Sequence, residues 1–215
     1  MQNPWHDLEP PYILPDDLAV IANHRNYSNL RLDTLPGQVV GGLDRAEVVF
    51  LVLNPGFDDK DITVDLTLPH FVEANRRNHT DPFGSPFYYL GGDLKQTGSY
   101  KWWRKRLNPL VKAGITETML RNKIMAIEYF PYHSEGYKKL PLIPSQRYAF
   151  DLVKEAMRRG KIIVVMRGKG QWFDAVPALK DYESTMIVKN YRQPYVSRGN
   201  LSEEDFDAIL SKLRD

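Results

Sequence analysis

The stretch from Ala46 to Asp59 reads AEVVFLVLNPGFDD and joins an apolar run to an abrupt turn signal. The nearly continuous apolar residues from Glu47 to Leu53 are typical of a β-strand covered on both faces, as in a parallel sheet. The run stops at Asn54, Pro55 and Gly56, which are common turn residues. Two interpretations are open: an ordinary turn, or a functional loop at the strand's carboxyl end.

Three further apolar runs follow along the chain, and segments with helical spacing lie between and after them. The runs are KIMAIEYF (Lys123–Phe130), KIIVVM (Lys161–Met166) and TMIV (Thr185–Val188). The helical segments are Tyr100–Ala113 with a bend at Pro109, Ser145–Arg159, about Asp174–Lys180, and a last helix capped by Ser202. Strands that alternate with helices predict an α/β domain around a mostly parallel sheet of four strands.

The remaining segments are less regular. Residues 1–40 hold two proline-rich stretches around a helix-like segment from Asp16, its expected N-cap, to about His24, and we interpret them as an arm wrapped on the domain. Ile62–Leu68 alternates apolar and polar residues and fits a strand or a helical turn. Glu73–Ser99 lacks clear periodicity and is expected to be a long loop, which is usually functional. One domain is predicted, with a core over 46–215.

Composition limits the class of protein. The chain has 215 residues, of which 42% are hydrophobic and 26% charged, as in soluble globular domains. It has no cysteine, which excludes disulfides and thiolate metal sites and suits a cytoplasmic protein. A net charge of +2 requires any nucleic-acid surface to be a local patch. Neither a signal peptide nor a membrane-spanning run is evident, so no membrane partner is expected.

Ligands of open α/β sheets bind beyond the carboxyl ends of the strands. Four segments should therefore share one rim: NPGFDD (54–59), EYFPYHSEGY (128–137), RGKGQWF (167–173) and NYRQPYVSRGN (190–200). RGKG lacks the spacing of a nucleotide-triphosphate loop and is better interpreted as a turn with solvated basic residues. The five histidines show no metal-ligand spacing, so no metal is expected. Only His133 follows a buried strand, where a structural role and a site role are equally open.

The order of the motifs is more informative than any one of them. LNPG, SPFYY, KWWRKRL, IEYFP, VMRGKG and NYRQPYVSRGNL occur in this order from about Glu47 to the end of the chain. In this respect the chain resembles the uracil-DNA glycosylase superfamily. The resemblance implies a three-layer α/β/α fold and an enzyme of DNA repair without metal or cofactor. Such an enzyme flips a base out of single- or double-stranded DNA and hydrolyses its N-glycosidic bond, and a monomer is expected.

The resemblance implies two catalytic residues. The superfamily's first motif carries an Asp or Asn that positions or activates the attacking water, and in the mismatch-specific branch it reads Gly-x-Asn-Pro-Gly. LNPG supplies the Asn as Asn54. The last motif has a His, or an Asn in the mismatch-specific branch, upstream of an Arg-Gly pair in the uracil-specific branch. Aligning Arg198 and Gly199 with that pair places Asn190 at this position, as a donor to a base carbonyl.

The resemblance also implies a base pocket and DNA contacts. The pocket would comprise Pro55, Gly56, Phe57, Glu128, and Phe87 or Tyr88 as a stacking platform. Tyr195 or Arg192 would be the wedge, and the main chain around Gly168 and Ser197, with Lys169 and Arg198, would hold phosphates.

The chain departs from the superfamily's pattern at several positions. Tyr191 and Arg192 replace the Pro and Ser of the last motif, and Pro194 falls at the leucine wedge position. Glu128 stands where several members place an Asn that reads uracil. An ionised carboxylate accepts from an exocyclic amine but opposes the O4 carbonyl of uracil, so a cytosine or adenine derivative is the expected substrate. An ion pair of Glu128 with Lys138 or Lys139 is the alternative.

Two other functions fit the same rim. One is a non-catalytic module of this fold that binds nucleic acid or a nucleotide. The other is a hydrolase of nucleosides or nucleotides without a DNA-holding surface. A glycosylase differs from both because it releases a base and leaves an abasic site in DNA.

Overall fold

The computed structural model describes residues 2–56 and 68–215, and a five-stranded sheet lies at its centre. The strands lie in the order β2-β4-β3-β6-β7, and all neighbours are parallel except β2, which is antiparallel to β4. Their bounds are β2 Val39–Val40, β3 Val48–Val52, β4 Ile124–Glu128, β6 Ile162–Val165 and β7 Thr185–Ile187. The general α/β class and the four predicted parallel strands are confirmed.

The prediction of four strands is one strand short. The fifth, β2, belongs to the amino-terminal arm and pairs Val39 with Ile127 and Val40 with Ala126. Two residues are too few to show the alternation by which a strand is recognised, so the sequence carries no signal for it. Through β2 the arm forms one edge of the sheet, and Val39 and Val40 belong to the hydrophobic cores on its two faces.

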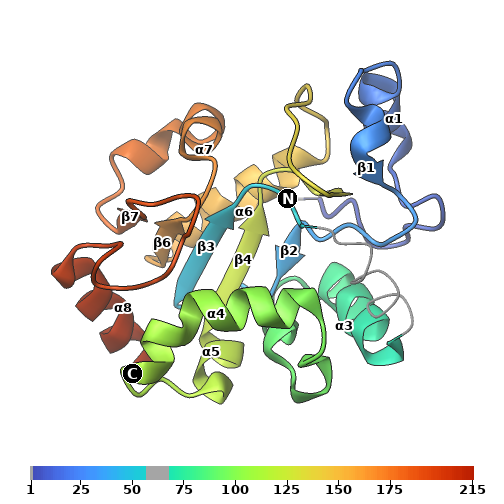
Figure 1. Cartoon of the computed structure of the whole chain (residues 1–215). Coiled ribbons are helices and arrows are strands. Elements are labelled where there is room, and N and C mark those ends of the chain that lie inside the picture. The colour runs from blue at the N-terminus through green and yellow to red at the C-terminus, as the bar shows by residue number, and fades with distance from the viewer. Residues whose placement is uncertain (1, 57–67) are drawn as a thin grey trace.

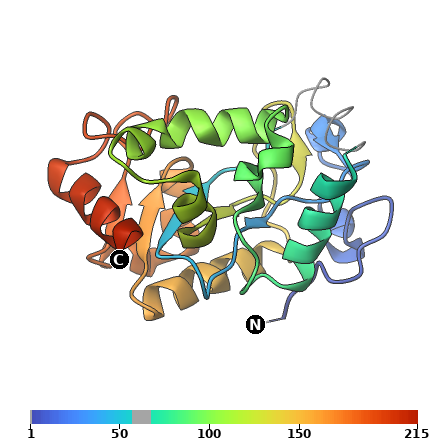
Figure 2. The ribbon, with the colours of Figure 1, turned by 90° about the horizontal axis from the view of Figure 1, so that it is seen from below.

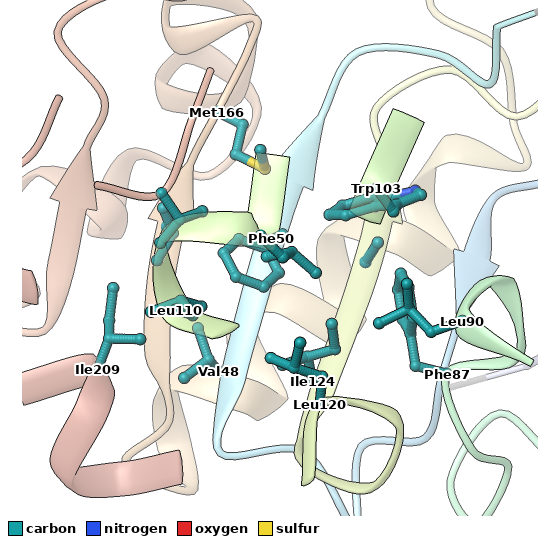
Figure 3. Close-up of a cluster of buried hydrophobic side chains, with 14 of the residues drawn as sticks. Val48, Phe50, Phe87, Leu90, Trp103, Leu110, Leu120, Ile124, Met166 and Ile209 are labelled. Atoms are coloured by element: carbon teal, nitrogen blue, oxygen red, sulfur yellow. The ribbon is translucent and has the colours of Figure 1, made fainter. Parts of the chain in front are cut away.

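Alternating residues of the parallel strands enter two separate cores, one on each face. In β3, Val48, Phe50 and Val52 belong to one core, while Val49 and Leu51 belong to the other. Figure 3 shows Val48 and Phe50 packed with side chains from the helices on the first face. Because successive side chains of a strand point to opposite faces, burial on both sides requires the continuous apolar run of the sequence.

Helices cover both faces of the sheet (Figures 1 and 2). The first face carries α4 (Gly98–Lys112), α5 (Glu117–Lys123) and α8 (Glu203–Arg214), with α3 (Pro69–Thr80) beside the β2 edge. The opposite face carries α6 (Gln146–Arg158), and α7 (Lys169–Ala175) and the 3-10 turn η4 (Pro177–Lys180) pack into the core on that side. Within the described ranges, none of the helices has the length and apolar character needed to cross a membrane.

Several predicted boundaries are wrong. Glu73–Thr80 is helical and not loop. The sequence does not reveal this helix, because α3 buries the polar residues Asn75, Asn78 and His79 and so lacks apolar periodicity. In place of an apolar contact, Asn78 exchanges hydrogen bonds of 2.7 and 3.1 Å with the backbone of Gly41. The helix expected over about Asp174–Lys180 corresponds to the end of α7, which begins at Lys169, and to the 3-10 turn η4. The helix α5 has no counterpart in the prediction.

The predicted helix caps differ in outcome. Ser202 accepts a hydrogen bond from the backbone N–H of Asp205, as expected for an N-cap. Asp16 is not a cap, because α1 (Pro15–Ile21) begins one residue earlier with Leu14 as its N-cap. Ser145 precedes α6 but makes no side-chain cap. The alternating segment from Ile62 lies, up to Thr67, outside the described residues.

The arm is anchored by a buried carboxylate. Asp17 in α1 is fully buried, and its two oxygens accept hydrogen bonds from the Tyr132 hydroxyl (2.6 Å) and the Ser145 backbone N–H (3.0 Å). Further along the arm, after the 3-10 turn η1 (Tyr27–Asn29), β1 (Leu30–Arg31) pairs with β5 (His133–Ser134). The arm is thereby attached to the segment that follows β4.

We expect Asp17→Ala to lower the free energy of unfolding by about 3 kcal/mol, because it leaves the Tyr132 hydroxyl and the Ser145 N–H buried without an acceptor. Asp16 is exposed beside it, so Asp16→Ala should cost less than about 0.5 kcal/mol. Urea unfolding followed by circular dichroism measures both. Equal effects of the two substitutions would contradict the anchoring role.

Candidate functional site

A cavity of about 340 Å³ opens beyond the carboxyl ends of β3 and β4. It is lined by the ends of β3 and β4, by the loops after β3, β4 and β6, by α3, α4 and the segment between these two helices, and by the arm. The lining residues are Thr34, Val52, Leu53, Asn54, Pro55, Gly56, Phe71, Tyr89, Gly98, Ser99, Trp102, Trp103, Glu128, His133, Ser134, Glu135, Gly136, Tyr137 and Arg167. Its volume lies at the small end of ligand pockets, which span about 300–1,000 Å³. A single base or nucleoside suits such a space.

The Asn54 side chain is held by its amide nitrogen. Nδ2 donates to the Ser134 hydroxyl (2.8 Å) and to the Pro55 carbonyl (3.0 Å). A carbonyl oxygen only accepts, so this contact determines which end of the amide faces Pro55. Among the described residues, both hydrogen bonds of the side chain use Nδ2, and Oδ1 is an acceptor that none of these residues occupies.

The loop after β3 is braced by the segment after β4. Gly56 and Ser134 form a parallel β-bridge, and the Ser134 N–H donates to the Pro55 carbonyl (3.3 Å). His133 Nδ1 lies 3.1 Å from the Gly56 carbonyl. These contacts hold the turn residues and Asn54 in one arrangement. Asn54, Pro55 and Gly56 therefore form an ordered turn at the edge of the cavity, and Ser134 is one of the residues that the sequence prediction did not single out.

Glu128, the last residue of β4, is a buried carboxyl group in the wall of the cavity. It is 9% exposed, and its Oε2 has no hydrogen-bond partner in the part of the chain that the structure describes. Burial raises its pKa well above the usual value, and the positive charge of Arg167 opposes this shift only in part. In the described structure it forms no ion pair with Lys138 or Lys139, so that alternative is not supported.

The aromatic lining differs from the expected one. Phe87 and Tyr88 are buried in the core and do not line the cavity, and Phe87 packs edge-on against Trp103 at 5.0 Å. Tyr89 and Trp102 line it instead. Tyr88 and Tyr89 both belong to the 3-10 turn η2 (Tyr88–Leu90), where one step along the chain changes a side chain's direction by about a third of a turn. Phe57 lies outside the described residues.

Asn190 does not line the cavity with Asn54. It follows β7, which is separated from β3 by β6, or about 10 Å across the sheet. Its Oδ1 accepts from the backbone N–H groups of Arg192 (3.1 Å) and Gln193 (3.2 Å) and so shapes its own turn. Only its Nδ2 is left as a donor, with no bond recorded for it in the described structure.

The expected phosphate-binding residues are dispersed along the rim. Arg198 pairs through both terminal nitrogens with Asp207, and this contact raises the pKa of the guanidinium. Lys169 is exposed and lies 5.6 Å from the Phe173 ring. Gly168 adopts a left-handed conformation before α7, where a side chain would meet Leu53. Ser197 is half-buried.

The two expected wedge residues, Arg192 and Tyr195, differ in exposure. Arg192 is exposed beside Tyr191, with its guanidinium 5.9 Å from that ring. Tyr195 is half-buried, and the guanidinium of Arg106 lies 6.0 Å from its ring. Arg192 is therefore free to reach outward, whereas Tyr195 is packed against α4.

The histidines form no metal centre in the part of the chain that the structure describes, where no group of three or more His, Asp or Glu residues could hold an ion. His133 lines the cavity, and its pKa is lowered mainly by burial. His79 is buried under the arm with Nε2 2.9 Å from the Pro36 carbonyl, and burial lowers its pKa to about 4. Both imidazoles are therefore neutral at neutral pH.

Comparisons with known proteins leave the family open: no protein-family model matches the chain, and no curated protein or solved structure matches it significantly. The geometry of the cavity therefore carries the functional argument. Arg167 is a member that the sequence interpretation passed over, although it directly follows a buried strand in one of the four rim segments.

The raised pKa of Glu128 predicts a pH-dependent difference between the wild type and Glu128→Gln. Between pH 4.5 and the folded-state pKa, the folded protein binds more protons than the unfolded chain, so wild-type stability falls as pH rises. Glutamine does not titrate, so the stability of Glu128→Gln relative to wild type should increase by about 1.4 kcal/mol per pH unit in this window.

Urea unfolding at intervals from about pH 4 to pH 8 measures this difference. Glu135 is exposed at the same cavity, so Glu135→Gln serves as the matched control and is measured over the same pH range. A constant difference for Glu128→Gln would show that the carboxyl group is not held in its neutral form.

Proposed function

We propose that this protein is a DNA N-glycosylase of the uracil-DNA glycosylase type, which hydrolyses the bond between a flipped base and its sugar. The observation that supports it most directly is that Asn54 and Glu128 line one base-sized cavity. The first offers a fixed acceptor for water, and the second a polar group that can recognise a base. The motif order that resembles this superfamily is the second support.

The proposed reaction needs a water molecule held against the sugar. The water oxygen bonds to C1′, and the N-glycosidic bond breaks with its electron pair leaving on the base. The proton lost by the water is taken up by solvent or by the departing base. Asn54 Oδ1 would orient the water, since its Nδ2 is already committed to Ser134 and Pro55.

A neutral Glu128 changes the expected base preference. An ionised carboxylate only accepts hydrogen bonds, whereas a carboxylic acid donates one and accepts another. Burial raises the pKa of Glu128 and favours the acid. A carboxylic acid can pair with the N3–H and O4 of uracil, as well as with N3 and the exocyclic amine of cytosine. We therefore include uracil beside modified cytosines, and we place the pyrimidine edge against Glu128.

Aromatic side chains complete the proposed pocket. A flipped base needs an aromatic ring to stack on, and Tyr89 and Trp102, which both line the cavity, would provide it. The base would leave the duplex, with exposed Arg192 as the candidate wedge. A partner DNA would then contact the rim formed by the loops after β3, β4, β6 and β7.

The test is base excision from oligonucleotides that carry single uracil, thymine-mismatch or modified-cytosine sites, with abasic sites detected by alkaline cleavage. We expect Asn54→Ala to reduce the rate at least about 100-fold, comparable to the loss of one positioned polar group in other enzymes. Asn122→Ala is the control, because Asn122 is exposed and bonds only to Arg45 in the described structure.

Two outcomes would contradict the proposal. Wild-type protein that binds the oligonucleotides but releases no base would be a binding module. Excision that survives Asn54→Ala at an undiminished rate would show that another residue holds the water. Circular dichroism of each variant establishes that the fold is intact.

A further inference from the structure

Two guanidinium groups lie close to the indole ring of Trp102, which lines the cavity. The Cζ atom of Arg106 is 4.2 Å from the ring centroid, and that of Arg167 is 5.6 Å from it. Arg106 comes from α4 and Arg167 from the loop after β6, so two elements distant in sequence bring these charges together. Arg167 also lines the cavity beside Glu128.

Within residues 2–56 and 68–215, no ion pair neutralises these two positive charges. The nearby carboxyl group, Glu128, favours its neutral form for the reason given above. Burial, followed by the charge of Arg167, lowers the pKa of Arg106. An arrangement that keeps two like charges close together without a carboxylate is stabilised by binding an anion.

The remaining contacts hold Arg106 in place and leave it short of partners. Its Nη1 donates to the Trp102 carbonyl (3.3 Å), and its own carbonyl accepts from the Val196 N–H (3.0 Å). Its Nε is buried and has no hydrogen-bond partner among the described residues. A buried donor without a partner is costly, so an acceptor from outside the chain is expected to satisfy it.

We propose that Arg106 and Arg167 form a binding site for the phosphate group of a nucleotide whose base occupies the neighbouring cavity. The guanidinium fork matches the oxygens of a phosphate, and two such groups suit its charge better than that of a carboxylate. The shared chemistry is a sugar phosphate ester, which either a DNA strand or a free mononucleotide supplies. The site deepens the proposed function, because it positions the nucleotide, but binding itself does not depend on base excision.

Equilibrium binding of thymidine and thymidine 5′-monophosphate tests the site directly. The wild type should bind thymidine 5′-monophosphate at least about 10-fold more tightly than thymidine, as expected for charge-assisted hydrogen bonds to the phosphate. Arg167→Gln should bring the affinity for the nucleotide down to that for the nucleoside, and Arg167→Lys should restore it in part. Lys105→Gln is the matched control, because Lys105 is exposed on the same helix as Arg106 and should change neither affinity.

A second arm uses a single-stranded oligonucleotide with an abasic analogue, titrated at several salt concentrations. If the strand supplies the phosphate, Arg167→Gln should reduce the slope of log affinity against log salt by about 1, while Lys105→Gln leaves it nearly unchanged. If only the mononucleotide responds to Arg167→Gln, a free nucleotide is the natural source. Either response supports the site.

The proposal is overturned if the phosphate adds no affinity in the wild type, or if Arg167→Gln and Lys105→Gln have equal effects in both arms. Arg106→Gln is a further variant, but its buried contacts make misfolding a risk, so half-buried Arg167 carries the test. The outcome is separable from that of base excision. Nucleotide binding that needs Arg167 without any excision would keep this site and reject the glycosylase.

Discussion

The parallel pairing of β3 with β4 is the constraint on which the rest of the site depends. Val52 lies opposite Glu128 in the register of the two strands, so both strands end at the same height. Asn54 follows two residues later, next to the segment that contains Ser134. Parallel strands bring residues about 75 positions apart in the chain to one edge of the sheet, where the two segments stay joined by backbone hydrogen bonds such as that from the Phe130 N–H to the Leu53 carbonyl.

The same strand geometry explains why Glu128 is buried. Ile124 and Ala126 of β4 belong to the core beneath α4, and side chains repeat with a period of two, so Glu128 points to that face as well. A carboxyl group at this position costs stability unless it is neutral or paired. An apolar residue would pack there without that cost, which supports the recognition role proposed for this carboxyl group.

The amino-terminal arm is part of the site and not an appendage. Its β2 extends the sheet beside β4, its β1 pairs with the segment carrying His133 and Ser134, and Thr34 lines the cavity. Asp17 fastens the arm to the core through Tyr132 and Ser145. The loop that braces Asn54 is therefore held from both sides. Trp102 of α4 also lines the cavity, and its ring lies close to the guanidinium groups of Arg106 and Arg167.

The amino-acid sequence by itself determined the four parallel strands and the rim at their ends, because burial on two faces demands apolar runs that turn residues interrupt. It also singled out Asn54 and Glu128, which directly follow or end such runs. Only the tertiary structure decided that Tyr89 and not Tyr88 faces the cavity, that Asn190 stands apart from Asn54, and that Ser134 and Arg167 join the site. These depend on the direction of side chains in a 3-10 turn, on strand order and on packing between distant segments, none of which leaves a periodic signal along the chain.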